Sequence, residues 1–262
     1  LLKSELASLK SAVVAFSGGV DSTFLLKVAK DVLDKKAVAV TLVSPVFPQR
    51  EIEKAKEIAL DFKVRHILIE VNLLKNPDFL KNDKNRCYVC KKIGFKKIIN
   101  WAEKNNFSYV VDGQNIDDLK DYRPGFKATK ELGVKSPLKD AGLNKDEIRK
   151  LLKDMNIAGY NRPALACLAS RIPYGTFLNE DLLKSLEKLE SYLIDKGFSQ
   201  VRVRHHDKIA RIEILKEEFE LLLDKKLLNG IVSEFKKSGY LYVTLDLEGY
   251  RTGSMNVFNS IA

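Results

Sequence analysis

The sequence predicts an α/β protein with an open, doubly wound parallel sheet and a second, smaller α+β domain. Two observations favour this fold class. Apolar strand-like runs alternate with amphipathic helical stretches up to Asp112, and a new alternation of the two begins after Gly175. Strands that alternate with helices indicate βαβ crossovers, and such sheets bind ligands at the carboxyl ends of their strands. Because 262 residues suffice for one large core and a small unit, we expect domains at 1–175 and 176–262.

The first expected strand leads directly into a glycine-rich turn. Residues 12–16 (AVVAF) are apolar and partly β-branched, as in a buried parallel strand, and apolar residues recur at helical spacing from Ser22. Further strands are expected at 37–43, 66–71 and 109–112, with helices at about 50–60 and 91–104.

Beyond Asp112 the chain has an irregular stretch followed by a second set of regular elements. From Asp112 to Gly175 glycine and proline interrupt the pattern, apart from one helix near 145–155, and long irregular stretches are usually functional. A helix at about 179–196, strands at 200–205, 209–214 and 240–246, and a further helix between the last two strands predict the small domain.

Composition limits the classes of function. With 45 Lys and Arg against 35 Asp and Glu the net charge is +10. This charge favours an anionic partner only weakly, because a solvated basic face on the helix surfaces is the more ordinary explanation. We find no apolar run long enough for a membrane span and no secretory signal, so we expect a cytoplasmic protein. Three cysteines without an export signal favour metal or redox chemistry over a disulfide framework.

The glycine-rich turn has the sequence Ser17-Gly18-Gly19-Val20-Asp21-Ser22. Its glycines let the backbone approach a ligand, and the amides at the start of the following helix favour an anion. A turn whose serine and aspartate only cap a helix is the alternative, but the position between strand and helix favours phosphate. The turn lacks the Gly-Lys-Ser/Thr of a Walker A loop, and hence a lysine for a γ-phosphate.

The segment AFSGGVDS resembles the PP-loop of ATP pyrophosphatases. This resemblance implies that a substrate oxygen attacks the α-phosphate of ATP and takes AMP, while Mg²⁺ helps to neutralise the departing pyrophosphate. Asp21 would be the acidic residue near the metal, with helix capping as its alternative role. At the ends of other predicted strands, Ser44, Asp112 and Gly113 are expected to line the nucleotide site.

The three cysteines are Cys87 and Cys90, which form a C-x-x-C pair, and Cys167. The spacing alone admits a zinc ligand pair, a redox dithiol or two ligands of an iron–sulfur cluster. A closed zinc site needs a fourth ligand, and the chain has only three histidines that could supply an imidazole. Two buried thiols without a function are a further alternative.

Residues 163–175 (PALACLASRIPYG), together with SGGVDS, DGQNIDD and DYRPG, resemble the LarE family, the sulfur-insertion proteins of nickel-pincer nucleotide synthesis. The resemblance implies that a carboxylate of pyridinium-3,5-biscarboxylic acid mononucleotide is adenylated and becomes a thiocarboxylate. In relatives with one matching cysteine, here Cys167, that residue gives up its sulfur and is left as dehydroalanine. Cys87 and Cys90 match a subgroup in which three cysteines hold a [4Fe-4S] cluster, with one iron left to carry an extra sulfide. We favour the cluster over sacrifice of Cys167.

Four further residues are candidates for binding substrate. Arg202 and Arg204 alternate along a predicted strand, so both can face one phosphate, and the resemblance suggests that of the mononucleotide; an ordinary exposed sheet face is the alternative. Arg171, beside the third cysteine, and Glu190 on the following helix are weaker candidates for binding pyrophosphate or substrate. A sulfide donor, other proteins of nickel-pincer synthesis and further copies of this chain are the expected partners.

Two other functions fit parts of the pattern. Some PP-loop tRNA thiolases also use three cysteines and a cluster, but they commonly carry an additional RNA-binding domain or zinc motifs, for which this chain has little room. We therefore do not expect a nucleic-acid substrate. A nucleotide sensor or an iron–sulfur carrier without catalysis would not need both the loop and three thiols.

Overall fold

The computed structural model describes residues 1–120, 124–163, 166–251 and 254–255. It divides into two compact units: Leu1–Phe79 with Lys84–Leu165, and Leu80–Asp83 with Ala166–Ala262. The division into domains at 1–175 and 176–262 stays a prediction. Residues 121–123 of the DYRPG segment and residues 164–165 of the LarE-like segment lie outside the described residues.

The first unit contains a parallel sheet with the strand order β3-β2-β1-β4. Val13 in the central strand β1 pairs with Val38 on one side and with Val110 on the other. The chain winds outward from β1 to β3 and then returns to place β4 on the opposite side. A strand order that reverses in this way opens a crevice at the carboxyl ends of β1 and β4, where ligands of such sheets bind. The strands are β1 (Ala12–Ala15), β2 (Ala37–Val43), β3 (Arg65–Glu70) and β4 (Val110–Val111).

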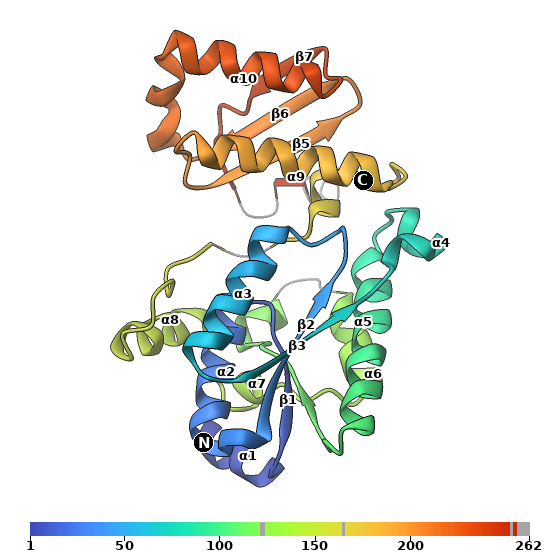
Figure 1. Cartoon of the computed structure of the whole chain (residues 1–262), viewed down its shortest axis with the longest axis vertical. Helices are drawn as coiled ribbons and strands as arrows, with labels where there is room; N and C mark the ends of the chain where they lie inside the picture. Colours follow the sequence, from blue (N-terminus) through green and yellow to red (C-terminus); the bar gives the residue numbers. More distant parts are fainter. Residues whose placement is uncertain (121–123, 164–165, 252–253, 256–262) are drawn as a thin grey trace. The chain divides into compact units, whose positions relative to one another are not determined.

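Helices cover both faces of this sheet, as Figure 1 shows. Alternate residues of β1 enter different cores, because successive side chains of a strand point to opposite faces. Val14 packs with α1, α2, α3 and α8, whereas Val13 packs with Phe95 and Ile98 of α5. The predicted doubly wound fold is therefore confirmed. The helices are α1 (Leu2–Leu9), α2 (Val20–Leu33), α3 (Gln49–Asp61), α4 (Pro77–Leu80), α5 (Arg86–Lys104), α6 (Gly125–Glu131), α7 (Pro137–Asp140) and α8 (Lys145–Asp154), with 3₁₀ turns η1 (Asp34–Lys36), η2 (Leu73–Lys75) and η3 (Ile116–Lys120).

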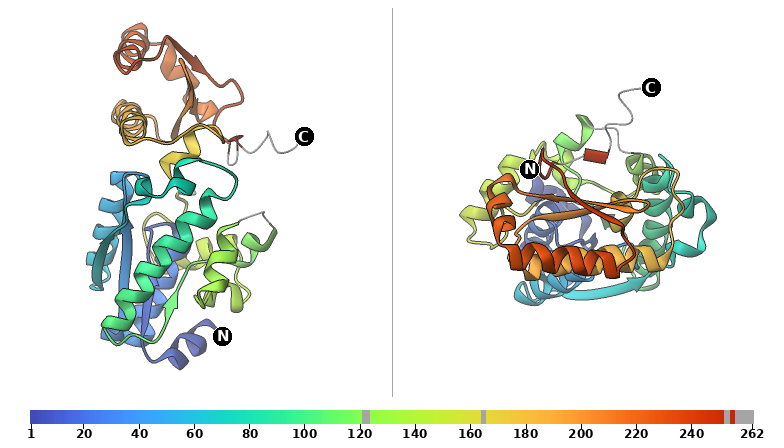
Figure 2. Two further views of the ribbon diagram at one scale, coloured as in Figure 1. Left: turned by 90° about the vertical axis from the view of Figure 1, so that its right-hand side faces the viewer. Right: turned by 90° about the horizontal axis from the view of Figure 1, so that it is seen from above.

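The second unit is a two-layer α+β structure, as predicted. Strand β5 (Val201–His206) is antiparallel to β6 (Ile209–Ile214), which is parallel to β7 (Tyr242–Leu245). Helices α9 (Glu180–Asp195) and α10 (Lys225–Lys237) lie on the same face of this sheet (Figure 2). The 3₁₀ turns η4 (Leu168–Arg171) and η5 (Lys216–Leu223) complete the unit.

The structure corrects two expectations about helices. Helix α5 begins at Arg86 rather than near Lys91, so the C-x-x-C pair lies in its first turns. The stretch expected to be irregular contains α6, which begins directly after Pro124, and α7, which begins at Pro137. Proline was interpreted there as a helix breaker, but its fixed φ and missing N–H suit the first turn of a helix.

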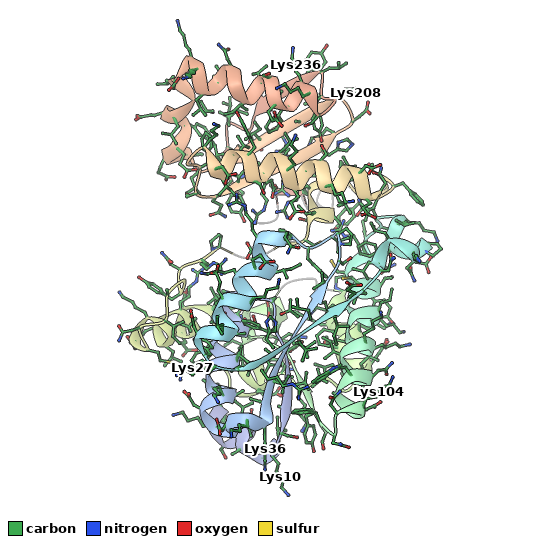
Figure 3. All side chains as sticks on the ribbon, in the orientation of Figure 1. Lys10, Lys27, Lys36, Lys104, Lys208 and Lys236 are labelled. Atoms are coloured by element: carbon green, nitrogen blue, oxygen red, sulfur yellow. The ribbon has the colours of Figure 1, made fainter. Side chains whose placement is uncertain are left out.

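Many of the lysines that were expected on helix surfaces are exposed. The six lysines labelled in Figure 3 point away from the ribbon, and all but Lys27, which is half-buried, are exposed. Among the helices in the described part of the chain, none combines the length and apolar character that crossing a bilayer requires.

Candidate functional site

The glycine-rich turn forms a closed loop at the carboxyl end of β1. The Ser17 amide donates to Ser22 Oγ over 3.3 Å, and Ser22 Oγ donates to the Gly19 carbonyl over 3.1 Å. The two serine hydroxyl oxygens lie 3.2 Å apart. These long hydrogen bonds hold the loop in shape, and the hydroxyls can exchange them for phosphate oxygens. Gly19 precedes the first residue of α2, so the unpaired amides of the helix start at the loop.

Two glycines are required where elements approach the loop closely. Gly18 has a φ of 73°, and a Cβ there would lie 3.2 Å from Ala55 Cβ on α3. Gly113, just after β4, comes so close to α2 that a Cβ would lie 3.0 Å from the Ser22 amide nitrogen. The loop and the end of β4 therefore lie side by side at the reversal of strand order. That these residues line a nucleotide site stays a prediction.

Asp21 lies in the first turn of α2 and has two differently placed carboxylate oxygens. Oδ2 accepts a hydrogen bond from Lys145 Nζ over 2.6 Å. Oδ1 is buried and has no hydrogen-bond partner among the described residues. Lys145 could not be predicted as a site residue from the sequence, because it is 124 positions from Asp21 and no local pattern distinguishes it from other surface lysines.

The other predicted nucleotide-site residues also lie at strand ends. Ser44 follows β2, and its hydroxyl is buried without a hydrogen-bond partner in the described part of the chain. Asp112 follows β4, where its carboxylate accepts hydrogen bonds from Ser136 Oγ over 2.8 Å and Gln114 Nε2 over 2.6 Å. Burial raises the pKa of Asp112 despite the Lys91 ammonium and these hydrogen bonds. Asp112 thus anchors the turn that carries Gly113 rather than offering an exposed charge.

The cysteines lie in different units. Cys87 is exposed and Cys90 half-buried in α5 of the first unit, and their i, i+3 spacing places both on one side of the helix. Cys167 is half-buried in the second unit, immediately before η4. None of these three described residues forms a disulfide. No group of three metal-binding side chains is found within the described residues.

A buried ion pair holds the segment around Cys167. Arg171 donates through Nε and one terminal nitrogen to the two oxygens of Glu190, each over 2.9 Å. Its other terminal nitrogen donates to the carbonyls of Ala166 over 2.7 Å and Cys167 over 3.0 Å. Burial lowers the pKa of Arg171, but Glu190 outweighs it, so the pKa lies above its ordinary value. Glu190 Oε1 also accepts from the Val203 amide over 2.9 Å, which ties this segment to β5.

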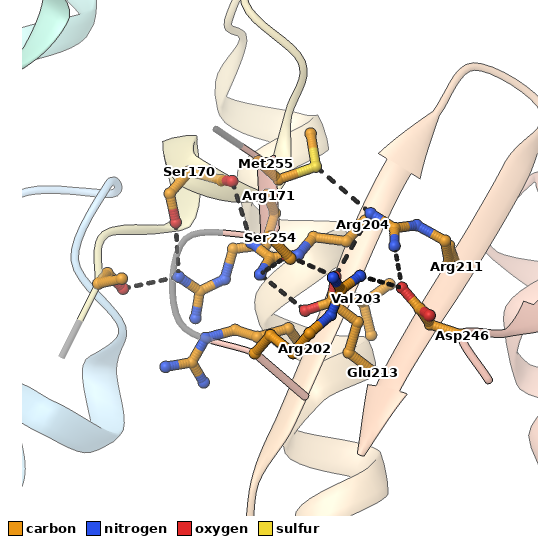
Figure 4. Close-up of polar contacts among 12 residues, drawn as sticks. Ser170, Arg171, Arg202, Val203, Arg204, Arg211, Glu213, Asp246, Ser254 and Met255 are labelled. Atoms are coloured by element: carbon orange, nitrogen blue, oxygen red, sulfur yellow. Dashed lines mark hydrogen bonds and ion pairs between the residues drawn. The ribbon is translucent and has the colours of Figure 1, made fainter. Parts of the chain in front are cut away.

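The two arginines of β5 differ in their surroundings (Figure 4). Arg204 is buried and donates to Glu213 over 2.7 Å, to Ser254 Oγ over 2.9 Å and to the Ser170 carbonyl over 3.1 Å. These contacts, and not a solvent-exposed sheet face, occupy its guanidinium. Arg202 donates to the Val201 carbonyl over 2.7 Å. Burial, followed by the positive charge of Arg171, lowers the pKa of Arg202, and the Glu190 carboxylate acts in the opposite direction.

Comparison with known proteins shows which proteins this chain resembles. Residues 11–83 match the family described as queuosine biosynthesis protein QueC. The chain is 36% identical to the pyridinium-3,5-bisthiocarboxylic acid mononucleotide synthase of Lactiplantibacillus plantarum, over 97% of this chain and 92% of that protein. It is 41% identical to an uncharacterized protein of Synechocystis, over 97% of this chain and 95% of that protein. An uncharacterized protein of Methanocaldococcus jannaschii is 31% identical, over 93% of this chain and 92% of that protein.

The parallel sheet, the SGGVDS loop at its central strand and the match over 11–83 define an ATP-using protein of the PP-loop class. The similarity to the Lactiplantibacillus enzyme extends along nearly the whole chain and identifies a narrower family within this class. The chain belongs to the LarE family, that of the pyridinium-3,5-bisthiocarboxylic acid mononucleotide synthase.

Proposed function

We propose that this chain is an ATP-dependent sulfurtransferase acting on pyridinium-3,5-biscarboxylic acid mononucleotide. A carboxylate oxygen attacks the α-phosphorus of ATP, forming an acyl adenylate and releasing pyrophosphate. Sulfur then attacks the acyl carbon, the bond to AMP breaks, and a thiocarboxylate and AMP leave. The observation that carries this proposal is the 36% identity to the Lactiplantibacillus enzyme along 97% of the chain.

In this proposal the loop binds the triphosphate. Ser17, Gly18, Gly19 and Ser22 supply amides and hydroxyls to its oxygens, while Ser44, Asp112 and Gly113 line the nucleotide site at the neighbouring strand ends. Asp21 is the residue that would hold Mg²⁺, because its buried Oδ1 lacks a hydrogen-bond partner among the described residues, as a metal ligand would before the metal binds. The metal would neutralise charge on the departing pyrophosphate.

The substrate phosphate is assigned to Arg202 in preference to Arg204. The Arg204 guanidinium already has Glu213, Ser254 and a carbonyl as acceptors. Arg202 is exposed to the positive charge of Arg171, which a bound phosphate would offset. Arg171 and Glu190 form a closed ion pair, so we assign them to holding the Cys167 segment rather than to contacting pyrophosphate or substrate.

Cys87, Cys90 and Cys167 are the residues that would hold a [4Fe-4S] cluster. The donor set fits, because cysteine thiolates are the usual ligands of such clusters and three of them leave one iron without a protein ligand. The cluster would supply the reaction with sulfur. Sacrifice of Cys167 remains the competing proposal. A cytoplasmic location, self-association, a sulfide donor and contacts with other proteins of nickel-pincer synthesis remain predictions.

The test is an anaerobic reconstitution with iron and sulfide, followed by ATP, Mg²⁺ and the biscarboxylic acid mononucleotide. We expect the thiocarboxylate product by mass spectrometry, and AMP with pyrophosphate from ATP. Formation of ADP in place of AMP would contradict the proposed activity. So would the absence of the thiocarboxylate from both the cluster-loaded and the cluster-free protein. The iron content of the protein that forms product distinguishes the two sulfur sources, because only the cluster proposal requires iron. Loss of one H₂S from the intact mass of the protein after turnover would identify sacrifice of Cys167.

A further inference from the structure

The phosphate loop contains no lysine, yet a lysine from a distant segment lies against it. Lys145 Nζ is 2.6 Å from Asp21 Oδ2, and both side chains are partly accessible, at 28% and 21%. An ammonium carries three N–H donors, and among the described residues Asp21 is its hydrogen-bond acceptor. A cation at this point faces the anion that the loop is built to bind.

The surrounding fold fixes the position of Lys145. Its backbone amide donates to Asp117 Oδ2 over 2.9 Å, and Asn144 and Glu147 form a capping box around the start of α8. Behind it Ile148 is fully buried in the same core as α2. The start of α8 is therefore held next to the start of α2, and the lysine reaches Asp21 from a fixed backbone.

Arg162 is a second cation at the loop, but it is less able than Lys145 to bind a phosphate. Arg162 donates to the Gly18 carbonyl over 3.3 Å and to Glu51 over 3.1 Å, so the ends of its guanidinium are occupied by the protein. Those contacts brace the loop against α3. Lys145, with one acceptor among the described residues, is the cation able to contact an incoming phosphate without losing a set of internal hydrogen bonds.

We propose that Lys145 contacts the triphosphate of bound ATP and supplies the cation that the loop itself lacks. This inference rests on the proposed use of ATP. Before ATP arrives, the ammonium offsets the Asp21 carboxylate, which would otherwise repel a polyanion. Once ATP is bound, the remaining N–H groups donate to phosphate oxygens, and such charge-assisted hydrogen bonds are roughly twice as strong as neutral ones.

The test is calorimetric titration with ATP, both in excess Mg²⁺ and in EDTA. Lys145→Gln should weaken ATP binding about tenfold or more, as expected for loss of a charge-assisted hydrogen bond. Lys145→Arg should bind within a few-fold of the wild type. The matched control is Lys150→Gln, which removes the same charge from an exposed position on α8 and should bind normally. Thermal melting checks that each variant is folded.

The outcomes distinguish failure of the proposed role of Lys145 from failure of the proposed use of ATP. Absence of ATP binding by the wild type in both conditions would refute the use of ATP itself. Equal affinities of Lys145→Gln and Lys150→Gln, with a binding wild type, would overturn the inference alone. A double variant, Asp21→Asn with Lys145→Gln, should still bind ATP about tenfold more weakly than Asp21→Asn. Equal affinities of these last two would mean that the lysine only neutralises Asp21, and would also overturn the proposal.

Discussion

The ion pair between Arg171 and Glu190 should be a principal determinant of the stability of the second unit. The two residues are 1% and 7% exposed, so neither charge is shielded by water. Arg171→Met would leave the Glu190 carboxylate buried with the Val203 amide as its remaining hydrogen-bond donor among those described. It would also remove the donor that holds the carbonyls of Ala166 and Cys167.

The expected loss is large. Removing one partner of a buried ion pair costs about 3–5 kcal/mol, because the remaining charge stays buried without compensation. In a unit of about 100 residues, this lowers the melting temperature by roughly 10 °C or more. Glu190→Gln removes the charge but keeps an acceptor for the Val203 amide, so its effect should come mainly from the orphaned Arg171. The double variant should lose less than the sum of the two, with a coupling of about 0.5–3 kcal/mol.

Urea unfolding followed by fluorescence and circular dichroism measures these differences. Lys184→Met is the matched control, because Lys184 pairs with Glu180 on the same helix at 65% and 50% exposure and its loss should change stability little. If Arg171→Met were no more destabilising than Lys184→Met, or if the single-variant effects were additive, the pair would not hold this segment as argued.

Three further predictions concern the loop, the pH response and the substrate. Gly18→Ala should lower the free energy of unfolding by about 1–3 kcal/mol and weaken ATP binding, since it combines a φ of 73° with crowding against α3. The control is Gly142→Ala, which has a φ of 76° but open space around its Cβ, so it should be strained and still bind ATP normally. Equal ATP affinities of the two variants would refute this prediction. Burial, and then Lys56, lowers the pKa of His66, so stability should decline as the pH falls below about 6.5, where the unfolded state alone gains a proton. His66→Gln should flatten that decline in urea titrations, and an unchanged slope would contradict it. Arg202→Gln should raise the KM for the mononucleotide about tenfold without altering ATP affinity; an unchanged KM would exclude Arg202 as the phosphate ligand.

The sequence predicted the sheet well because each strand is a short apolar run with its own boundaries. Strand β2 at Ala37–Val43 and strand β6 at Ile209–Ile214 match the expected ranges, since buried strands carry their signal locally. The start of α5 and the short helices α6 and α7 were not predicted, because their stability comes from contacts with distant segments rather than from their own periodicity.

The candidate site was predictable only where a motif is contiguous. The loop and the strand-end residues were proposed from local sequence, and the loop geometry follows from Gly18 and the start of α2. The pairing of Lys145 with Asp21 depends on how α8 packs on α2, which no local pattern encodes. Likewise, alternation along β5 placed Arg202 and Arg204 together, but it could not show that Glu213 on the next strand binds Arg204.

The two proposals for the sulfur source make opposite predictions for one variant. Under sacrifice, Cys167 Sγ attacks the acyl adenylate and AMP leaves; the Cα proton is then removed, the Cβ–S bond breaks, and the electron pair remains on the thiocarboxylate. That route does not involve Cys87 or Cys90. A variant with both changed to serine should then still form about one product per chain and lose H₂S from its mass. Under the cluster proposal the same variant should contain little iron and form no product, while the reconstituted wild type turns over repeatedly. One product per chain from the variant, together with no more than one product per chain from the reconstituted wild type, would refute the cluster proposal.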